Sequence, residues 1–157
     1  MRGASQNRVA AWIFCACLLG CTDRDRGPVV LKPSLPSAAF VQQALRQPDA
    51  LPEAELKAQL QSGSGPAAQL AALRVLHGRQ QGVDETAALL EADGTDPIVR
   101  INALAGLAEM HTPAARTVIE RRYRGGAPQA ERRHIADLLR QYGGREDLEL
   151  LKQLQPR

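Results

Sequence analysis

Aromatic residues are scarce in this sequence, and their scarcity restricts the fold class. Phe, Trp and Tyr together make up 3% of the 157 residues, and two of them, Trp12 and Phe14, lie near the N-terminus. By contrast, Ala and Leu contribute 25 and 21 residues. Sheets favour β-branched and aromatic side chains, whereas helices favour Ala and Leu. The composition therefore predicts an all-α protein and argues against an all-β fold and against the aromatic platforms that bind single-stranded nucleic acids.

Cysteine and long apolar segments are also missing from most of the chain. The three cysteines, Cys15, Cys17 and Cys21, all lie in the first 21 residues. The remaining sequence therefore offers no thiol for a disulfide, a thiolate zinc site or a cysteine nucleophile. The uncharged segment 9–20 has twelve residues. A helix of that length, at about 1.5 Å per residue, is too short to span about 30 Å of hydrocarbon.

The first 20 residues have the pattern of a secretory signal peptide. Arg2 and Arg8 carry positive charge without an accompanying acid, and an apolar segment that ends in small residues follows them. Residues 18–21 (LLGC) resemble the bacterial lipobox, although Ala or Ser is more common at the place of Leu19. The resemblance implies that the Cys21 thiol is acylated, that the signal peptide is removed before it, and that acyl chains such as palmitate anchor the protein. An ordinary signal peptide and a permanent membrane anchor remain the alternatives.

The residues around Cys21 also bear on location and charge. In Gram-negative lipoproteins an Asp directly after the cysteine favours the inner membrane, so Thr22 favours the periplasmic face of the outer membrane. Removal of residues 1–20 leaves 18 basic and 17 acidic residues, so the formal charge of +3 gives no reason to expect nucleic-acid binding. Within residues 21–35, the lipidated cysteine is followed by residues 22–35, which show no helical period and predict a flexible tether that reaches about 45 Å when extended.

A spacing of 31 residues recurs through the rest of the sequence. Pro66, Pro97 and Pro128 are each 31 residues apart, and apolar residues after them repeat with the same spacing. Two such columns are Leu73, Leu104 and Ile135, and Leu76, Leu107 and Leu138. Each unit contains two helical patterns bounded by Pro or Gly. We therefore expect three helix pairs over residues 66–157 and a degenerate leading pair over residues 36–65.

The middle unit has the clearest helical pattern. Asp96 is expected to cap a helix that begins at Pro97. The predicted apolar stripe of this helix consists of Ile98, Ile101, Leu104 and Leu107. Asp96, Pro97, Val99 and Arg100, followed by an Ala and Leu column, resemble the opening of a HEAT repeat of the short bacterial class.

The HEAT resemblance carries structural expectations. It implies an α-solenoid of antiparallel helix pairs, in which Arg100 bonds to the turn aspartate of a neighbouring unit. Tetratricopeptide repeats are the nearest rival, but their period of about 34 residues and their aromatic pattern fit less well. An unrelated helical bundle remains a further alternative.

No arrangement of residues points to a catalytic, cofactor-binding or metal-binding site. His77 and His111 are predicted to lie in loops and His134 in a helix, so they do not supply the three clustered ligands of a catalytic zinc site. The acidic pairs at 84–85 and 146–147 fall at predicted helix starts, where the helix dipole favours negative charge. We therefore expect neither enzymatic activity nor a cofactor.

Charge is distributed unevenly along the chain. Residues 49–96 hold eight acids and three bases, whereas residues 97–145 hold nine bases and four acids. Helical spacing predicts that Asp137 pairs with Arg133. The candidate partner surface consists of Arg116, Arg121, Arg122, Arg124, Arg132 and Arg133. Such a surface could dock an acidic protein partner or anionic lipid headgroups.

These patterns predict a membrane-anchored periplasmic lipoprotein that serves as a protein-binding scaffold. A pilotin, or another assembly accessory of an envelope machine, is the alternative binding role. A third alternative is an enzyme similar to the phycobilisome lyases, which also contain short HEAT-like repeats, but the chain after residue 21 lacks a thiol. Neither the partner nor the oligomeric state follows from the sequence.

Overall fold

The computed structural model describes residues 33, 35–61 and 64–154, and these residues form helices and no strand. The all-α prediction is confirmed for this part of the chain. The predicted signal peptide, Cys21 and most of the predicted tether lie outside the described residues. None of the described helices is both long and apolar enough to cross a membrane. The elements are α1 (Ser37–Arg46), the 3-10 helix η1 (Pro48–Ala50), α2 (Glu53–Gln61), α3 (Pro66–Gly78), α4 (Val83–Glu91), α5 (Pro97–Met110), α6 (Pro113–Arg124), α7 (Gln129–Tyr142) and α8 (Arg145–Leu154).

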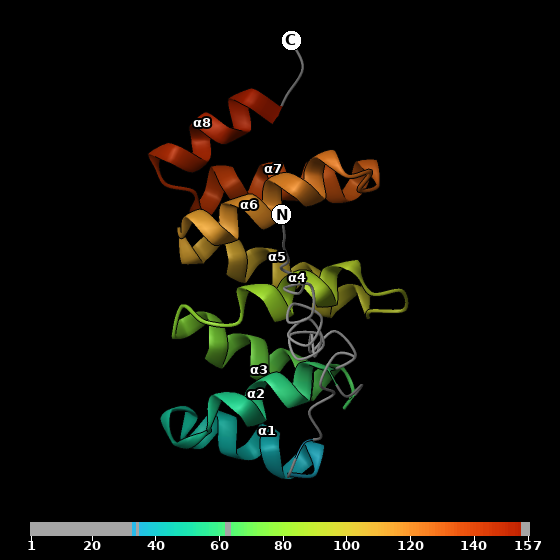
Figure 1. Ribbon diagram of the computed structural model, residues 1–157, viewed down its shortest axis with the longest axis vertical. Helices are drawn as coiled ribbons and strands as arrows, with labels where there is room; N and C mark the ends of the chain where they lie inside the picture. Colours follow the sequence, from blue (N-terminus) through green and yellow to red (C-terminus); the bar gives the residue numbers. More distant parts are fainter. Residues whose placement is uncertain (1–32, 34, 62–63, 155–157) are drawn as a thin grey trace, which may run out of the picture.

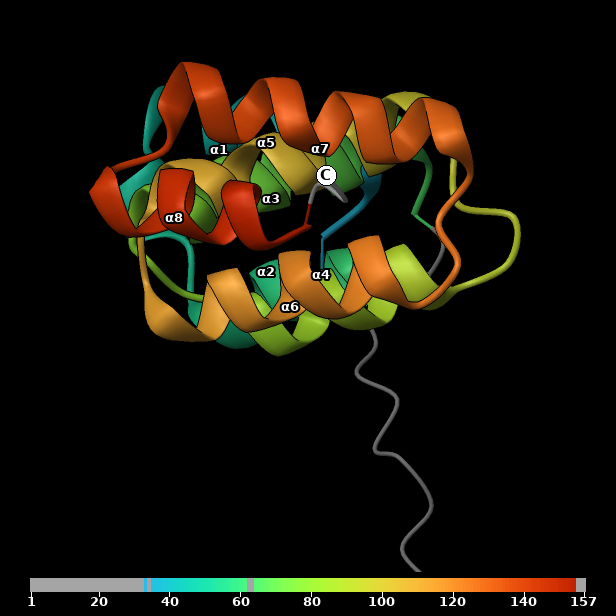
Figure 2. The same ribbon diagram turned by 90° about the horizontal axis from the view of Figure 1, so that it is seen from above.

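The helices stack along one long axis, with α1 at one end and α8 at the other (Figure 1). In the view along this axis, α1, α3, α5 and α7 form one layer and α2, α4 and α6 form the other (Figure 2). α8 lies across the end of the stack, between the two layers, and packs on α6 and α7. Since α5 contacts α3, α7, α4 and α6, only a narrow strip of it faces solvent.

The 31-residue spacing marks where helices of the first layer begin. Pro66 and Pro97 are the first residues of α3 and α5, and Pro128 directly precedes α7. Proline suits this place because the first helical N–H groups have no partner within the helix. Asp96 caps α5 by accepting a 2.8 Å hydrogen bond from the backbone N–H of Ile98, as predicted.

Both predicted leucine columns lie in the core. Their members are Leu73, Leu104 and Ile135, and Leu76, Leu107 and Leu138, and all six are buried. Burial of one such side chain contributes about 1.5–3 kcal/mol relative to exposure. The two columns therefore supply much of the apolar contact that holds α3, α5 and α7 in the stack.

The predicted stripe of α5 is wrong at two positions. Ile98 and Ile101 are 60% and 48% exposed, whereas Val99 and Ala103 are fully buried. A stripe at steps of three and four describes a helix that packs on one side, but α5 packs on both flanks and on its inner side. Most of the circumference of α5 is therefore buried, and Ile98 and Ile101 lie on the narrow side that faces solvent.

The three histidines lie in different surroundings. His77 is inside α3, not in a loop as predicted, because the helix continues to Gly78. His111 follows the last residue of α5 and His134 lies within α7, both as predicted.

α4 begins at Val83, one residue before the helix start expected at the acidic pair 84–85. Gly82 adopts a left-handed backbone conformation and ends the turn that precedes the helix.

The chain is fixed in place just before α1. The backbone N–H of Leu35 donates to Glu55 Oε1 at 3.2 Å, and Gln59 Nε2 donates to the Leu35 carbonyl at 3.1 Å. Gln59 Nε2 also donates to Glu55 Oε1 at 3.0 Å, and both side chains are buried. Two polar side chains of α2 thus satisfy the peptide groups on either side of Leu35, as a neighbouring strand would.

Candidate interaction surface

The arginines of α6 that form most of the predicted partner surface are engaged in ion pairs. Arg124 pairs with Glu120 at 2.7 Å, and Arg121 lies 3.5 Å from Glu91 of α4. Arg122 donates two hydrogen bonds to Glu131 of α7, from Nε at 2.5 Å and from Nη2 at 3.0 Å. The bonds to Glu131 raise the pKa of Arg122 above its ordinary value. Each of these guanidinium groups therefore already has a carboxylate beside it, although Arg121 and Arg124 remain exposed.

Arg116, the fourth arginine of α6, belongs to a buried network with α8. Its Nε donates to Asp147 Oδ1 at 2.7 Å, its Nη2 donates to the carbonyl of His111 at 2.9 Å, and its Nη1 pairs with Glu146. Asp147 is 2% exposed and also accepts a 2.8 Å hydrogen bond from the backbone N–H of Gly144. The network ties the start of α6 to the start of α8.

Asp147 is held as a carboxylate by this network. Burial alone would raise its pKa, but the hydrogen bonds from Gly144, Arg116 and His111 outweigh burial and lower the pKa below the ordinary 3.8. The predicted acidic pair at 146–147 does lie in the first turn of α8. Asp147, however, faces inward and binds Arg116. The helix dipole explains an acid at this position but does not predict that contact.

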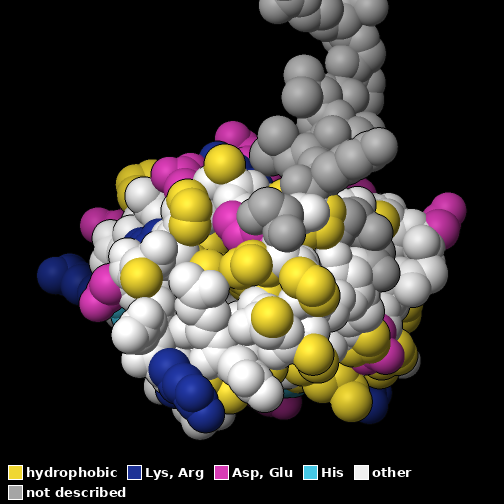
Figure 3. All heavy atoms as spheres, turned by 90° about the horizontal axis from the view of Figure 1, so that it is seen from below, with side chains coloured by type: hydrophobic (Ala, Val, Ile, Leu, Met, Phe, Trp, Pro, Cys, Tyr) yellow, Lys and Arg dark blue, Asp and Glu magenta, His cyan; other side chains and the backbone are white. Residues whose placement is uncertain are grey.

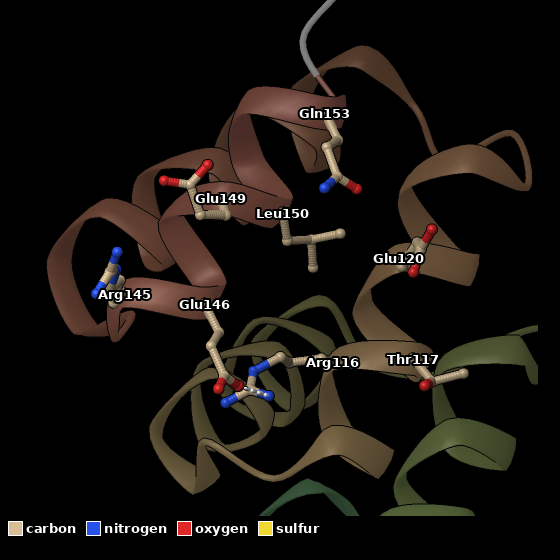
Figure 4. Close-up of a pocket in the computed structure, with 8 residues that line it drawn as sticks. All are labelled: Arg116, Thr117, Glu120, Arg145, Glu146, Glu149, Leu150 and Gln153. Atoms are coloured by element: carbon tan, nitrogen blue, oxygen red, sulfur yellow. Dashed lines mark ion pairs between the residues drawn. The ribbon is translucent and has the colours of Figure 1, made fainter.

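A shallow pocket of about 490 Å³ adjoins this network between α6 and α8 (Figure 4). Its lining residues are Arg116, Thr117, Glu120, Arg145, Glu146, Glu149, Leu150 and Gln153. The Arg116 guanidinium and the Glu146 carboxylate face each other across its floor (Figure 4). Because the charges of both signs already neutralise each other, this pocket has no dominant charge with which to select a ligand.

The last two predicted surface residues, Arg132 and Arg133, differ from the arginines of α6. Both are exposed on α7, and neither forms an ion pair within the described residues. The predicted pair of Arg133 with Asp137 is absent, because Asp137 accepts instead from Arg140 at 2.7 Å. Of the six predicted arginines, therefore, only these two carry unpaired charge.

A groove that the sequence analysis did not predict runs between α3 and α5. It measures about 660 Å³ and is lined by Leu70, Arg74 and His77 on one side and by Asn102, Ala105 and Glu109 on the other, among others. Gly106 lies at its floor, where a β-carbon would come 1.7 Å from Nδ1 of His77. An isolated glycine inside an Ala- and Leu-rich helix was the one sequence signal for this close approach.

His77 is the most perturbed histidine of the described chain. Its Nε2 lies 3.0 Å from Oγ1 of Thr86, and the Thr86 hydroxyl donates to the carbonyl of Gly82 at 2.6 Å. The hydroxyl therefore accepts from a protonated Nε2 of a neutral ring. Burial lowers the pKa of His77 from 6.5 to about 4. The ring is a structural donor between α3 and α4 that carries no charge at neutral pH.

This pKa predicts a loss of stability in mild acid. In the unfolded chain His77 takes up a proton below about pH 6.5, whereas in the folded chain it does so only near pH 4. Stability is thus complete above pH 6.5 and falls as the pH drops to 4, by about 2 kcal/mol once solvent at the edge of the ring is considered. Urea denaturation at pH 7, 5.5 and 4.5 measures this slope.

The matched variant for this measurement is His77→Gln, which keeps a donor near Thr86 but cannot titrate. We expect its free energy of unfolding to change far less between pH 7 and 4.5 than that of the wild-type chain. An equal slope in both proteins would contradict the assignment to His77.

The four residues that resemble the opening of a HEAT repeat fix the start of α5 and its contact with α4. Asp96 caps α5, Pro97 begins it and Val99 is fully buried. Arg100 donates to two carbonyls near the end of α4, Leu90 at 2.9 Å and Ala92 at 3.4 Å. The resemblance implied a turn aspartate as its partner, and these carbonyls take that place. They also suit a cation, since the last carbonyls of a helix are unpaired and lie at its negative end.

Within residues 33, 35–61 and 64–154, no three His, Cys, Asp or Glu side chains are grouped so that they could hold a metal ion. The acylation site expected at Cys21 lies outside these ranges. No protein-family model matches the chain, and no curated protein and no solved structure is significantly similar to it.

Proposed function

We propose that this chain is a lipid-anchored α-solenoid of HEAT-like helix pairs that binds a protein partner at the bacterial membrane. The observation that carries the proposal is the two-layer stack, in which each helix packs mainly on its neighbours in sequence and in the same layer (Figures 1 and 2). Stacks of this kind offer long, continuous outer faces for binding. The 31-residue spacing and the opening at Asp96 and Pro97 support the HEAT-like assignment.

Two polar contacts between described helices support a binding role. The ion pair of Asp147 and Arg116 connects α6 to α8, and the hydrogen bond of the neutral His77 ring connects α3 to α4. These side chains are held by several partners and are used to fix helices. Binding by a rigid face needs such fixed helices, because each group that a partner would otherwise have to order reduces affinity.

The anchor is proposed at Cys21, at the periplasmic face of the outer membrane. The proposed tether leads into α1, at one end of the stack. Seen from that end, hydrophobic side chains gather at the surface (Figure 3), and Leu45 of α1 is 65% exposed.

Replacement of the acylated cysteine tests the anchor. We expect the full chain, with its leader, to fractionate with bacterial membranes and to resist a high-salt wash, and the Cys21→Ser variant to lose this association. Cys17→Ser, inside the proposed signal peptide, is the matched control and should behave as the wild type. Mass spectrometry of the N-terminal peptide should show Cys21 with acyl chains, and an unmodified Cys21 in the membrane fraction would refute the anchor.

The binding role has its own test. A C-terminal affinity tag on the detergent-extracted chain should recover one protein in constant proportion from independent preparations. Recovery that varies with detergent and salt, without a reproducible partner, would count against a scaffold. If Cys21→Ser also displaces that partner from the membrane, the assembly-accessory role is favoured.

A further inference from the structure

Unpaired positive charge lies on the layer opposite to α6. Arg74 of α3 and Arg132 and Arg133 of α7 are exposed and form no ion pair within the described residues. The two acids of α7 do not neutralise these arginines, because Glu131 is paired with Arg122 and Asp137 with Arg140. Among the described residues of these helices, Glu109 of α5 is the acid without an ion-pair partner. The outer face of α3, α5 and α7 is therefore net positive.

The same face carries two exposed isoleucines of α5. Ile98 and Ile101 lie on the outer strip of α5, and Leu70 of α3 is half-buried in the groove between α3 and α5. Single exposed apolar residues need no explanation, but two isoleucines one helical turn apart form a short apolar strip on the outer side of α5.

The repeat register places an arginine beside this strip. Leu70 and Asn102 line the groove between α3 and α5 from its two sides. Thirty-one residues later, Ile101 on α5 and Arg133 on α7 occupy the equivalent places, and α5 and α7 are in contact. Arg74 lies at the other flank of the strip, on α3. The apolar strip of α5 thus has an unpaired cation on each side.

We propose that this outer face of α3, α5 and α7 docks an acidic amphipathic segment of the protein partner. The apolar side of the segment packs on Ile98, Ile101 and the groove, and its carboxylates meet Arg74 and Arg133. This is the groove mode of peptide recognition, with apolar anchors in the middle and charge pairing at the rim. The inference rests on the proposed binding function and adds to it the face and the chemistry of the partner.

A protein segment suits this face better than an anionic membrane does. The groove is concave and offers the amide of Gln80 and the amide oxygen of Asn102, whose Nδ2 donates to the Ile98 carbonyl, and these groups can hydrogen-bond to the backbone of a bound segment. His77 adds no charge there at neutral pH, since burial keeps its pKa near 4.

Site-specific photo-crosslinking in cells that produce the full chain tests the proposal. Benzoylphenylalanine replaces Asn102 on the proposed face or Thr117 on α6, and both positions are exposed. We expect the probe at 102, and not the probe at 117, to give an adduct whose partner peptide is acidic and has apolar residues at helical spacing.

Charge and apolar variants with matched controls sharpen this test. In the chain with the probe at 102, Ile101→Glu and Arg133→Glu should each lower the adduct yield about tenfold, the effect of losing an interaction of about 1.4 kcal/mol. Leu148→Glu and Arg145→Glu alter an exposed leucine and an unpaired arginine on α8, and should leave the yield unchanged. Circular dichroism of each variant checks that the helices are intact.

Each other outcome has a definite meaning. An adduct only at 117 would overturn the face and keep the scaffold function. An adduct at 102 with phospholipid, or with a second copy of this chain, would overturn the acidic protein segment as the occupant. The absence of a specific adduct at both positions, together with no reproducible partner in the affinity purification, would overturn the proposed function as well.

Discussion

Asp147→Ala is expected to lower the free energy of unfolding by about 3 kcal/mol, the cost of removing one partner from a buried ion pair. The substitution leaves the backbone N–H of Gly144 unpaired and removes the carboxylate that holds Arg116 and His111. Arg116 keeps Glu146 and is 22% exposed, which places the loss at the lower end of the range for such pairs. Urea denaturation followed by circular dichroism measures it.

Glu146→Ala is the matched control, because Glu146 pairs with the same arginine but is 72% exposed. Its loss should stay within about 0.5 kcal/mol. Equal losses in the two variants would show that the network does not depend on the buried carboxylate.

The pH dependence of stability offers a second check. The pKa of Asp147 is lowered below 3.8 in the folded chain, so the contribution of this carboxylate to the free energy of unfolding is present above pH 3.8 and is lost only as the pH falls further.

Gly106→Ala is expected to destabilise the chain by about 3 kcal/mol, at the upper end for an overpacked core. The added β-carbon would lie 1.7 Å from Nδ1 and 2.5 Å from Cε1 of His77. The ring cannot yield cheaply, because its Nε2 is bonded to Thr86 behind it. The gain of about 1 kcal/mol that alanine offers over glycine in a helix is therefore outweighed.

The sign of this effect should reverse when the ring is removed. In a His77→Ala background the space beside residue 106 is free, so Gly106→Ala should become neutral or stabilise the chain by about 1 kcal/mol. A double-mutant cycle of the four proteins in urea measures the coupling. If Gly106→Ala costs the same with and without the ring of His77, the close approach of α3 and α5 is not what glycine is needed for.

Local sequence signals predicted the helices well. Pro97 and Asp96 define the start of α5 through short-range chemistry, a missing N–H and a side-chain cap, and both act within one turn. The columns of Leu73 and Leu76 are predicted by the 31-residue spacing, because equivalent positions of successive units face the same core. The apolar period within a single helix was less reliable, since it placed the exposed Ile98 and Ile101 on the buried side of α5.

The surface was predicted less well, because side chains on different helices decide it. Arg121 meets Glu91, and Arg116 meets Asp147, which is 31 residues away. Helical spacing within one helix cannot reveal such pairs, but the repeat period can, since it brings residues one unit apart next to each other. Applied to charged residues as well as leucines, that period would have singled out the pair of Arg116 and Asp147.

The bonds at Leu35 have a mechanical consequence for an anchored protein. In the proposed state, a pull between the membrane and a bound partner reaches the stack at Leu35, before the first turn of α1. Glu55 and Gln59 pass this load to α2, so their hydrogen bonds to Leu35 are strained together and α1 is not unwound one turn at a time. In that proposed state, the hydrogen bonds at Leu35 would let the stack carry tension while its first helix stays folded.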